Sequence, residues 1–133
     1  MPMFASMAGI YLHIPFCRKA CHYCNFHFST SFRMKDEMVQ ALITELELQS
    51  GYLQGQRIET LYFGGGTPSA LSSQDISILV DQVHQHFEIT DDAEITLEAN
   101  PDDIHADNLK AWKKAGINRL SLGIQAFQDE LLR

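Results

Sequence analysis

Three cysteines lie within one eight-residue segment, and they are the residues of this 133-residue chain with the clearest capacity for chemistry. Cys17, Cys21 and Cys24 form a C-x3-C-x2-C pattern, and the chain has no other cysteine. An odd number of cysteines does not suggest a disulfide framework. Thiolates are soft ligands that favour zinc or an iron–sulfur cluster. The pattern therefore predicts a metal centre in a reducing compartment, which makes the cytosol the expected location.

The number of thiolates separates two kinds of metal centre. A closed zinc site needs a fourth ligand, which His13, His22 or His27 could supply. A four-iron cluster normally takes four cysteines, so three would leave one iron open to an exogenous molecule. Arg18 and Lys19 lie in the same segment, and they could offset the negative charge of a thiolate-bound cluster or be ordinary solvated cations.

Strand and helix patterns alternate along the chain around this segment. The expected strands are Ile10–Ile14, Glu59–Phe63, Glu94–Ala99 and Arg119–Ile124. The expected helices are about Met34–Gln54, from near Ser72 through an apolar stripe ending at Phe87, and about Ala106–Ala115, with a fourth beginning around Asp129–Arg133. Ser72 and Asp75 have the spacing of a capping box, which marks a helix start. This order predicts an α/β fold with a parallel sheet.

Each expected strand has one aliphatic face and one polar or small face, because side chains alternate across a strand. In the third strand, Ile95, Leu97 and Ala99 alternate with Thr96 and Glu98. The aliphatic face is expected to pack on the helices. A polar opposite face fits an open barrel lined for a ligand, since a closed eight-stranded barrel is filled with branched aliphatic side chains. The alternative is a one-sided sheet whose polar face meets solvent.

Charge and length exclude several classes of protein. Ten basic and seventeen acidic residues give a formal net charge of −7, which argues against a nucleic-acid partner. No apolar run approaches the ~20 residues of a transmembrane helix. A complete barrel needs ~250 residues, so we expect the N-terminal part of a longer protein. Residues 1–6 are expected to be an extension ahead of a core domain at 7–133.

Five segments, taken in order, resemble a known family. They are Tyr11–Cys17, Cys21–Cys24, Phe63–Ser69, Glu98–Pro101 and Ser121–Gln125. The cysteine pattern is similar to that of the radical S-adenosylmethionine (SAM) superfamily, and the five segments together resemble its oxygen-independent coproporphyrinogen III oxidase family. The resemblance covers nearly all of residues 7–133. It implies a partial (β/α) barrel of radical-SAM type, of which about four strands of the N-terminal portion are present.

The resemblance also implies the residues of the site. Cys17, Cys21 and Cys24 would ligate a [4Fe-4S] cluster whose open iron is held by SAM. The implied SAM contacts are Tyr11, Gly65, Gly66, Thr67, Glu98 and Gln125. Judged without the family, the glycines also fit a plain tight turn, Tyr11 fits simple packing and Glu98 fits a solvated strand end.

One departure from the family pattern bears on function. Phe26 stands two residues after the third cysteine, where the oxidase carries a further cysteine. This favours the HemW-like branch of the family, whose members are regarded as haem chaperones. The resemblance thus implies haem and a haem-acceptor protein as partners, with the haem-binding region downstream of Arg133. The alternatives are oxidative decarboxylation of coproporphyrinogen in porphyrin biosynthesis and, in another class, a structural zinc module.

Overall fold

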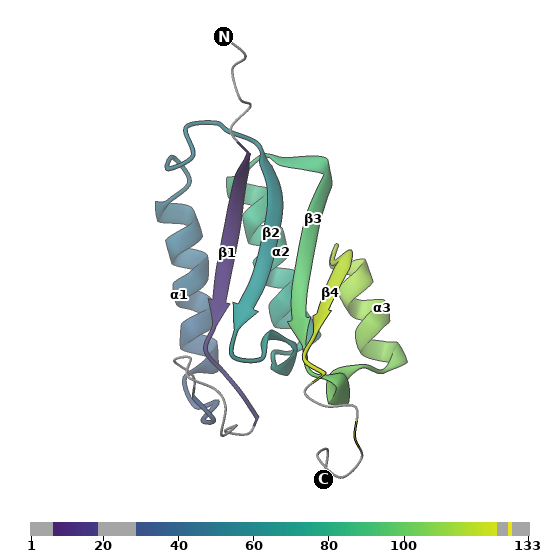
Figure 1. Ribbon diagram of the computed structural model, residues 1–133. Helices are drawn as coiled ribbons and strands as arrows, with labels where there is room; N and C mark the ends of the chain where they lie inside the picture. The colour runs from purple at the N-terminus through teal and green to yellow at the C-terminus, as the bar shows by residue number, and fades with distance from the viewer. Residues whose placement is uncertain (1–6, 19–28, 125–127, 129–133) are drawn as a thin grey trace.

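The computed structural model describes residues 7–18, 29–124 and 128 (Figure 1). The described strands are β1 (Ala8–Ile14), β2 (Ile58–Gly65), β3 (Ile89–Ala99) and β4 (Arg119–Leu122). The described helices are α1 (Lys35–Leu48), α2 (Ser73–His86) and α3 (Ala106–Lys114), with short 3₁₀ turns η1 (Pro68–Ala70) and η2 (Pro101–Asp103). The predicted alternation of strands and helices is confirmed over these ranges.

The four strands form one sheet in the order β1-β2-β3-β4, and each neighbouring pair is parallel. Figure 1 shows the four arrowheads pointing the same way, so the segments that follow the strands meet at one edge of the sheet. The cysteine segment follows β1, a glycine turn follows β2, and η2 follows β3. The parallel α/β architecture predicted from the sequence is therefore correct, and it gathers three connecting segments in one place.

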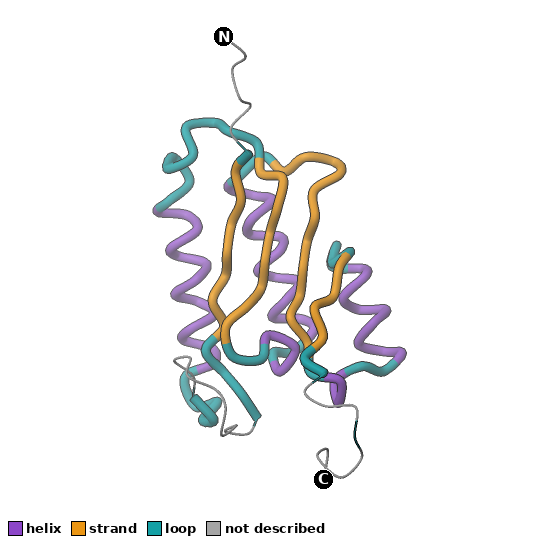
Figure 2. The backbone as a smooth tube through the Cα atoms, viewed as in Figure 1, coloured by secondary structure: helices purple, strands orange, loops and turns teal. Residues whose placement is uncertain are grey.

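One face of the sheet carries the hydrophobic core. Leu61, Phe63 and Leu97 on the strands are fully buried, as are Ile76 and Leu79 on α2. Burying each such side chain contributes about 1.5–3 kcal/mol, so this layer between sheet and helices is a main source of stability. Figure 2 shows the helices on the same side of the sheet, with the strands in front of them.

Helix α2 begins as its capping pattern predicts. The Asp75 amide donates a hydrogen bond to Ser72 Oγ at 3.1 Å, and the Ser72 amide donates to Asp75 Oδ2 at 3.3 Å. Lys35, at the start of α1, reaches the same carboxylate at 2.7 Å. Burial alone would raise the pKa of Asp75, but the bonds from Lys35 and Ser72 lower it. The two helix starts are thereby joined next to the carboxyl edge of the sheet.

Several element boundaries differ from the prediction. Strand β1 begins at Ala8 rather than Ile10, and β2 runs on to Gly65 rather than ending at Phe63. Helix α1 ends at Leu48, and the chain continues in turns through residues 49–55. Gln54 and Gly55 take positive φ angles of 51° and 80°, so the helix cannot extend to Gln54 as predicted. Strand β3 begins at Ile89 rather than Glu94, because Ile89 pairs with Ile58 on β2. The polar residues 90–92 interrupt the alternating pattern from which the strand is predicted. Strand β4 ends at Leu122. The fourth helix, expected around residues 129–133, lies outside the described residues.

The second face of the sheet carries no helix from the described part of the chain. Thr60 and Glu94 are exposed on it, and Tyr11 is 56% exposed. This open face has the polar or small side chains predicted for it, although Thr96 is fully buried within it. Within the described ranges, none of the helices has the length and apolar character needed to cross a membrane.

Candidate functional site

The first cysteine lies at an anchored point just beyond β1. Phe16 is 4% exposed and stacks on Phe32 with ring centroids 5.4 Å apart, and Cys17 is 8% exposed. The Cys17 amide donates to the Ser29 carbonyl at 2.9 Å, and the Ser29 amide donates to the Pro15 carbonyl at 2.6 Å. The chain therefore enters and leaves the cysteine segment at one place, because these two bonds hold its ends together.

The glycine turn after β2 is bonded to this same point. The Gly66 amide donates to the Ile14 carbonyl at 2.8 Å, and the Thr67 amide donates to the Phe16 carbonyl at 2.7 Å. The Thr67 hydroxyl donates to Cys17 Sγ at 3.6 Å. These contacts fix the thiol of Cys17 between the exit of β1 and the turn.

Two of the glycines cannot be replaced without disturbing this contact. A Cβ on Gly66 would lie 2.6 Å from the Phe16 carbonyl oxygen and 2.9 Å from Cys17 Sγ. Gly65 has a φ of +115°, and a Cβ there would lie 2.8 Å from the His13 ring. Glycine is thus required because the turn approaches both the β1 backbone and the thiol, which is more than a plain tight turn needs.

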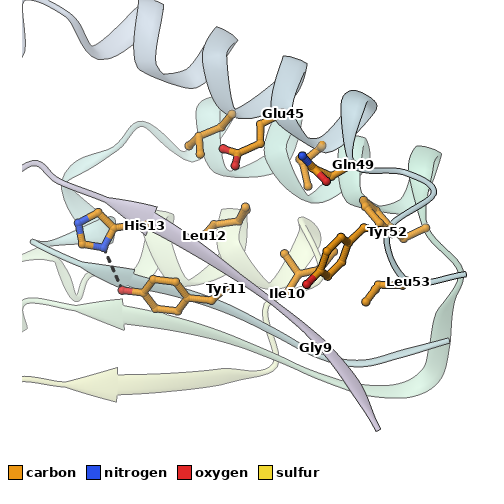
Figure 3. A pocket seen from close by; sticks show the side chains of 12 residues that line it. Gly9, Ile10, Tyr11, Leu12, His13, Glu45, Gln49, Tyr52 and Leu53 are labelled. Carbon is orange, nitrogen blue, oxygen red and sulfur yellow. Dashed lines mark hydrogen bonds between the residues drawn. The ribbon is translucent and has the colours of Figure 1, made fainter. Parts of the chain in front are cut away.

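The open face beside this point carries a ladder of aromatic and polar side chains. Tyr11 and Tyr62 are directly paired across β1 and β2, and their rings stack with centroids 6.0 Å apart. The Tyr62 hydroxyl donates to Glu98 Oε1 on β3 at 2.7 Å. The Tyr11 hydroxyl lies 3.1 Å from His13 Nδ1, the bond drawn in Figure 3. Glu98 is therefore oriented by the phenol of the neighbouring strand.

Both phenols hold their protons more tightly than usual. Burial raises the pKa of Tyr11, with a further contribution from the negative charge of Glu98. The hydrogen bond to Glu98 is the main reason that the pKa of Tyr62 is raised, followed by burial. At neutral pH this face therefore presents neutral phenols beside a carboxylate.

The raised pKa of Tyr62 predicts a pH-dependent contribution to stability. We expect Tyr62→Phe to destabilise the fold below the unfolded-state pKa of about 10, because the neutral phenol then donates to Glu98. The difference between parent and variant should disappear as pH rises through the folded-state pKa. Chemical denaturation across pH and ultraviolet titration of tyrosinate would measure both effects. Tyr52→Phe is the matched control, since Tyr52 is 77% exposed, and equal stability of all three proteins at neutral pH would contradict the bond.

A separate groove runs along the outer edge of β1. Its volume is about 320 Å³, and it lies between the strand and the C-terminal half of α1 (Figure 3). Leu42, Leu46 and Leu53 give it an apolar lining, and Glu45 and Tyr52 also border it. Tyr11 and His13 on β1 also line this groove, but Cys17 and the glycine turn do not. The groove therefore shares Tyr11 with the predicted site without containing its metal-binding end.

The structure brings together four of the predicted site residues and places two more nearby. Cys17, Gly65, Gly66 and Thr67 meet at the carboxyl edge, and Tyr11 and Glu98 lie on the open face. Cys21, Cys24 and Gln125 lie outside the described residues, as do Lys19, His22, Phe26 and His27. His13, weighed as a zinc ligand, bonds to Tyr11. Within the described ranges no three His, Cys, Asp or Glu side chains form a metal-binding group.

Three residues of this edge were not predicted from the sequence. Tyr62 orients Glu98, and its place on the polar face beside Tyr11 was the available signal. Ser69 and Asp103 form a buried hydrogen bond of 2.6 Å between η1 and η2. No local pattern indicates that bond, because it joins two connections that are distant in sequence.

Comparisons with known proteins give a consistent result. The Radical SAM superfamily profile matches residues 11–133. The heme chaperone HemW of Escherichia coli (strain K12) is 40% identical over 127 residues, which cover 94% of this chain and 34% of that protein. The heme chaperone HemW of Bacillus subtilis (strain 168) is 40% identical over 128 residues, covering 95% and 34%. The chain thus spans about a third of the length of these relatives.

A solved structure shares the fold. Coproporphyrinogen III oxidase (HemN) from Escherichia coli, described as a radical SAM enzyme, superposes with a TM-score of 0.87 at 33% sequence identity. The match covers 99% of this chain and 31% of that one. The four parallel strands and their helices are therefore a part of a fold of that type.

Proposed function

The chain belongs to the radical SAM superfamily, and on that premise we propose that it holds a [4Fe-4S] cluster through Cys17, Cys21 and Cys24 and binds SAM beside it. The observation that carries the proposal is the Cys17 thiol fixed between the exit of β1 and the turn at Gly66 and Thr67. Both Cys17 and this turn lie at the carboxyl edge of the sheet, where barrel proteins place their chemistry.

Among the described residues, the surroundings of Cys17 suit a ligand of such a cluster. Cys17 is buried, and its sulfur accepts a hydrogen bond from Thr67, which stabilises the thiolate form that binds iron. Gly66 leaves the turn without a Cβ that would press on that sulfur. When bound, the cluster and SAM together supply one-electron chemistry at this edge.

The open face fits a ligand with a cationic group. Glu98 offers a carboxylate that Tyr62 already orients, and Tyr11 offers an exposed ring beside it. A carboxylate and aromatic faces attract an ammonium or sulfonium centre, both of which SAM carries. We therefore assign Tyr11, Gly65, Gly66, Thr67, Glu98 and Gln125 as the SAM contacts.

For the full-length protein we propose a haem chaperone of the cytoplasm that delivers haem to an acceptor protein. Support comes from the relatives that bear the name heme chaperone HemW and from Phe26, which replaces the additional cysteine of the oxidase. The second candidate is coproporphyrinogen oxidation, which the likeness to the solved oxidase favours.

Binding of SAM is tested by removing its proposed carboxylate contact. We expect Glu98→Ala in the full-length protein to weaken SAM binding by about tenfold or more, because a hydrogen bond to a charged group is lost. Gln125→Ala should also weaken it, and iron content should not change. SAM binding is read from its perturbation of the electron paramagnetic resonance signal of the cluster. Glu94→Ala is the matched control, since Glu94 lies on the same strand and face but is paired with Arg119. Parent-like binding in both site variants would refute the assigned face.

Haem binding and porphyrin oxidation separate the two candidate functions. The full-length protein is expected to bind haem, detected by its absorbance band, and to leave coproporphyrinogen unchanged with reductant and SAM under anaerobic conditions. The reason is the absence of the additional cysteine at Phe26. Sustained decarboxylation under those conditions would instead establish the oxidase function.

A further inference from the structure

A buried carboxylate lies next to the cysteine segment without a role in the proposed site. The side chain of Asp103, in η2 after β3, is only 4% exposed. The Ser69 hydroxyl donates to its Oδ2 at 2.6 Å, and the Arg18 guanidinium lies 2.9 Å from its Oδ1. Both oxygens of Asp103 are therefore engaged, one by the connection after β2 and one by the cysteine segment.

The Ser69 hydroxyl also joins the two connections through the backbone. Ser69 is 2% exposed, and its Oγ accepts a hydrogen bond from the Asn100 amide at 3.0 Å. The Asp103 carbonyl accepts from the Asn108 side chain at 2.9 Å, which ties η2 to α3. Asp103 is thus attached to rigid elements on two sides, whereas Arg18 is mostly exposed with 63% of its side chain accessible.

The difference in exposure decides which partner positions the other. A buried carboxylate costs free energy unless it is paired, so Asp103 requires its cation. Arg18 directly follows Cys17, and the ion pair fixes the direction in which the chain leaves the anchored cysteine. We propose that Asp103, acting through Arg18, is a positioning residue that holds Cys17 and the start of the cysteine segment in place for cluster binding. The role in cluster binding rests on the proposed function.

The physical benefit is preorganisation. Three thiolates must converge on one cluster, and ordering the chain at binding costs conformational entropy. The Cys17 amide is already bonded to Ser29, and the ion pair adds a second constraint one residue later. Loss of the ion pair should therefore loosen the Cys17 amide and speed the loss of iron, without removing any ligand.

The experiment uses the full-length protein with Arg18→Ala, Arg18→Lys and Asp103→Asn. We expect hydrogen exchange of the Cys17 amide in the metal-free protein, and iron loss to a chelator after anaerobic reconstitution, to accelerate about tenfold in Arg18→Ala and Asp103→Asn, at the low end of outer-shell effects. Arg18→Lys should restore most of both rates, because it keeps the charge. Asp102→Asn is the matched control, an exposed carboxylate in the same turn. Arg18→Ala tests the proposal even where Asp103→Asn fails to fold.

The two readouts distinguish this proposal from the proposed function. Parent-like exchange of the Cys17 amide in Arg18→Ala would overturn the positioning role, whatever the iron content. Failure of Arg18→Lys to restore the exchange rate would also overturn it, because the charge would then not matter. A parent protein that assembles no cluster would refute the proposed function, while faster exchange in Arg18→Ala would still support the ion pair as the constraint on Cys17.

Discussion

Replacing Cys17 with alanine is expected to abolish the iron–sulfur cluster of the full-length protein. Anaerobic reconstitution of the parent with iron and sulfide should give a brown protein with about four irons per chain, and the variant should retain almost none. Cys17 is the proposed ligand that lies among the described residues, and it is held through the Ser29 carbonyl and the Thr67 hydroxyl. Cys21→Ala and Cys24→Ala are expected to have the same effect, since three thiolates already leave one iron without a protein ligand.

The matched control for this loss is Ser29→Ala. Ser29 closes the other end of the cysteine segment through its backbone, and its side chain bonds only within Ser29–Ser31 among the described residues. Iron and sulfide content should therefore stay at the parent level. A parent that instead binds one zinc tightly and no sulfide would replace the cluster with the structural zinc module.

The fold could be predicted from local patterns because those patterns correspond to the physical units of the sheet. The stripe through Ile76, Leu79 and Val83 is fully buried, as a 3.6-residue period predicts. The capping box at Ser72 and Asp75 is present. The predicted end of α1 is wrong, because the apolar pattern continues to Leu53 while the backbone turns after Leu48 and takes positive φ angles at Gln54 and Gly55.

For the candidate site, the sequence predicts which face of its own strand a side chain occupies, but not which side chains of other strands or loops it contacts. Alternation along β1 and β3 places Tyr11 and Glu98 on the polar face, and the structure bears this out. The stacking of Tyr11 on Tyr62 depends on the register between β1 and β2. The pairing of Arg18 with Asp103 depends on three connections meeting at one edge. Such contacts follow from tertiary packing, so no local spacing in the sequence indicates them.

Replacing Gly66 with alanine is expected to be the most damaging change that leaves all three proposed cysteine ligands in place. The new Cβ would lie 2.6 Å from the Phe16 carbonyl oxygen and 2.9 Å from Cys17 Sγ, closer than side-chain carbons are found in proteins. The carbonyl is backbone and accepts the Thr67 amide at 2.7 Å, so it cannot move without breaking that bond. The exit of β1 and the turn must separate, which costs about 1–3 kcal/mol or more.

This separation would act directly on the proposed cluster, because the displaced atoms include the Cys17 thiol. In the full-length Gly66→Ala protein we expect a lower melting temperature and, at temperatures where it stays folded, iron loss to a chelator well above the parent rate. Gly51→Ala is the matched control, since a Cβ on Gly51 would meet nothing within 4 Å. Its melting temperature and iron retention should equal or slightly exceed those of the parent, because Gly→Ala reduces the entropy of the unfolded chain. If Gly66→Ala behaved like Gly51→Ala in both measurements, the turn would not be packed against Cys17. The close contact on which the proposed function rests would then be refuted.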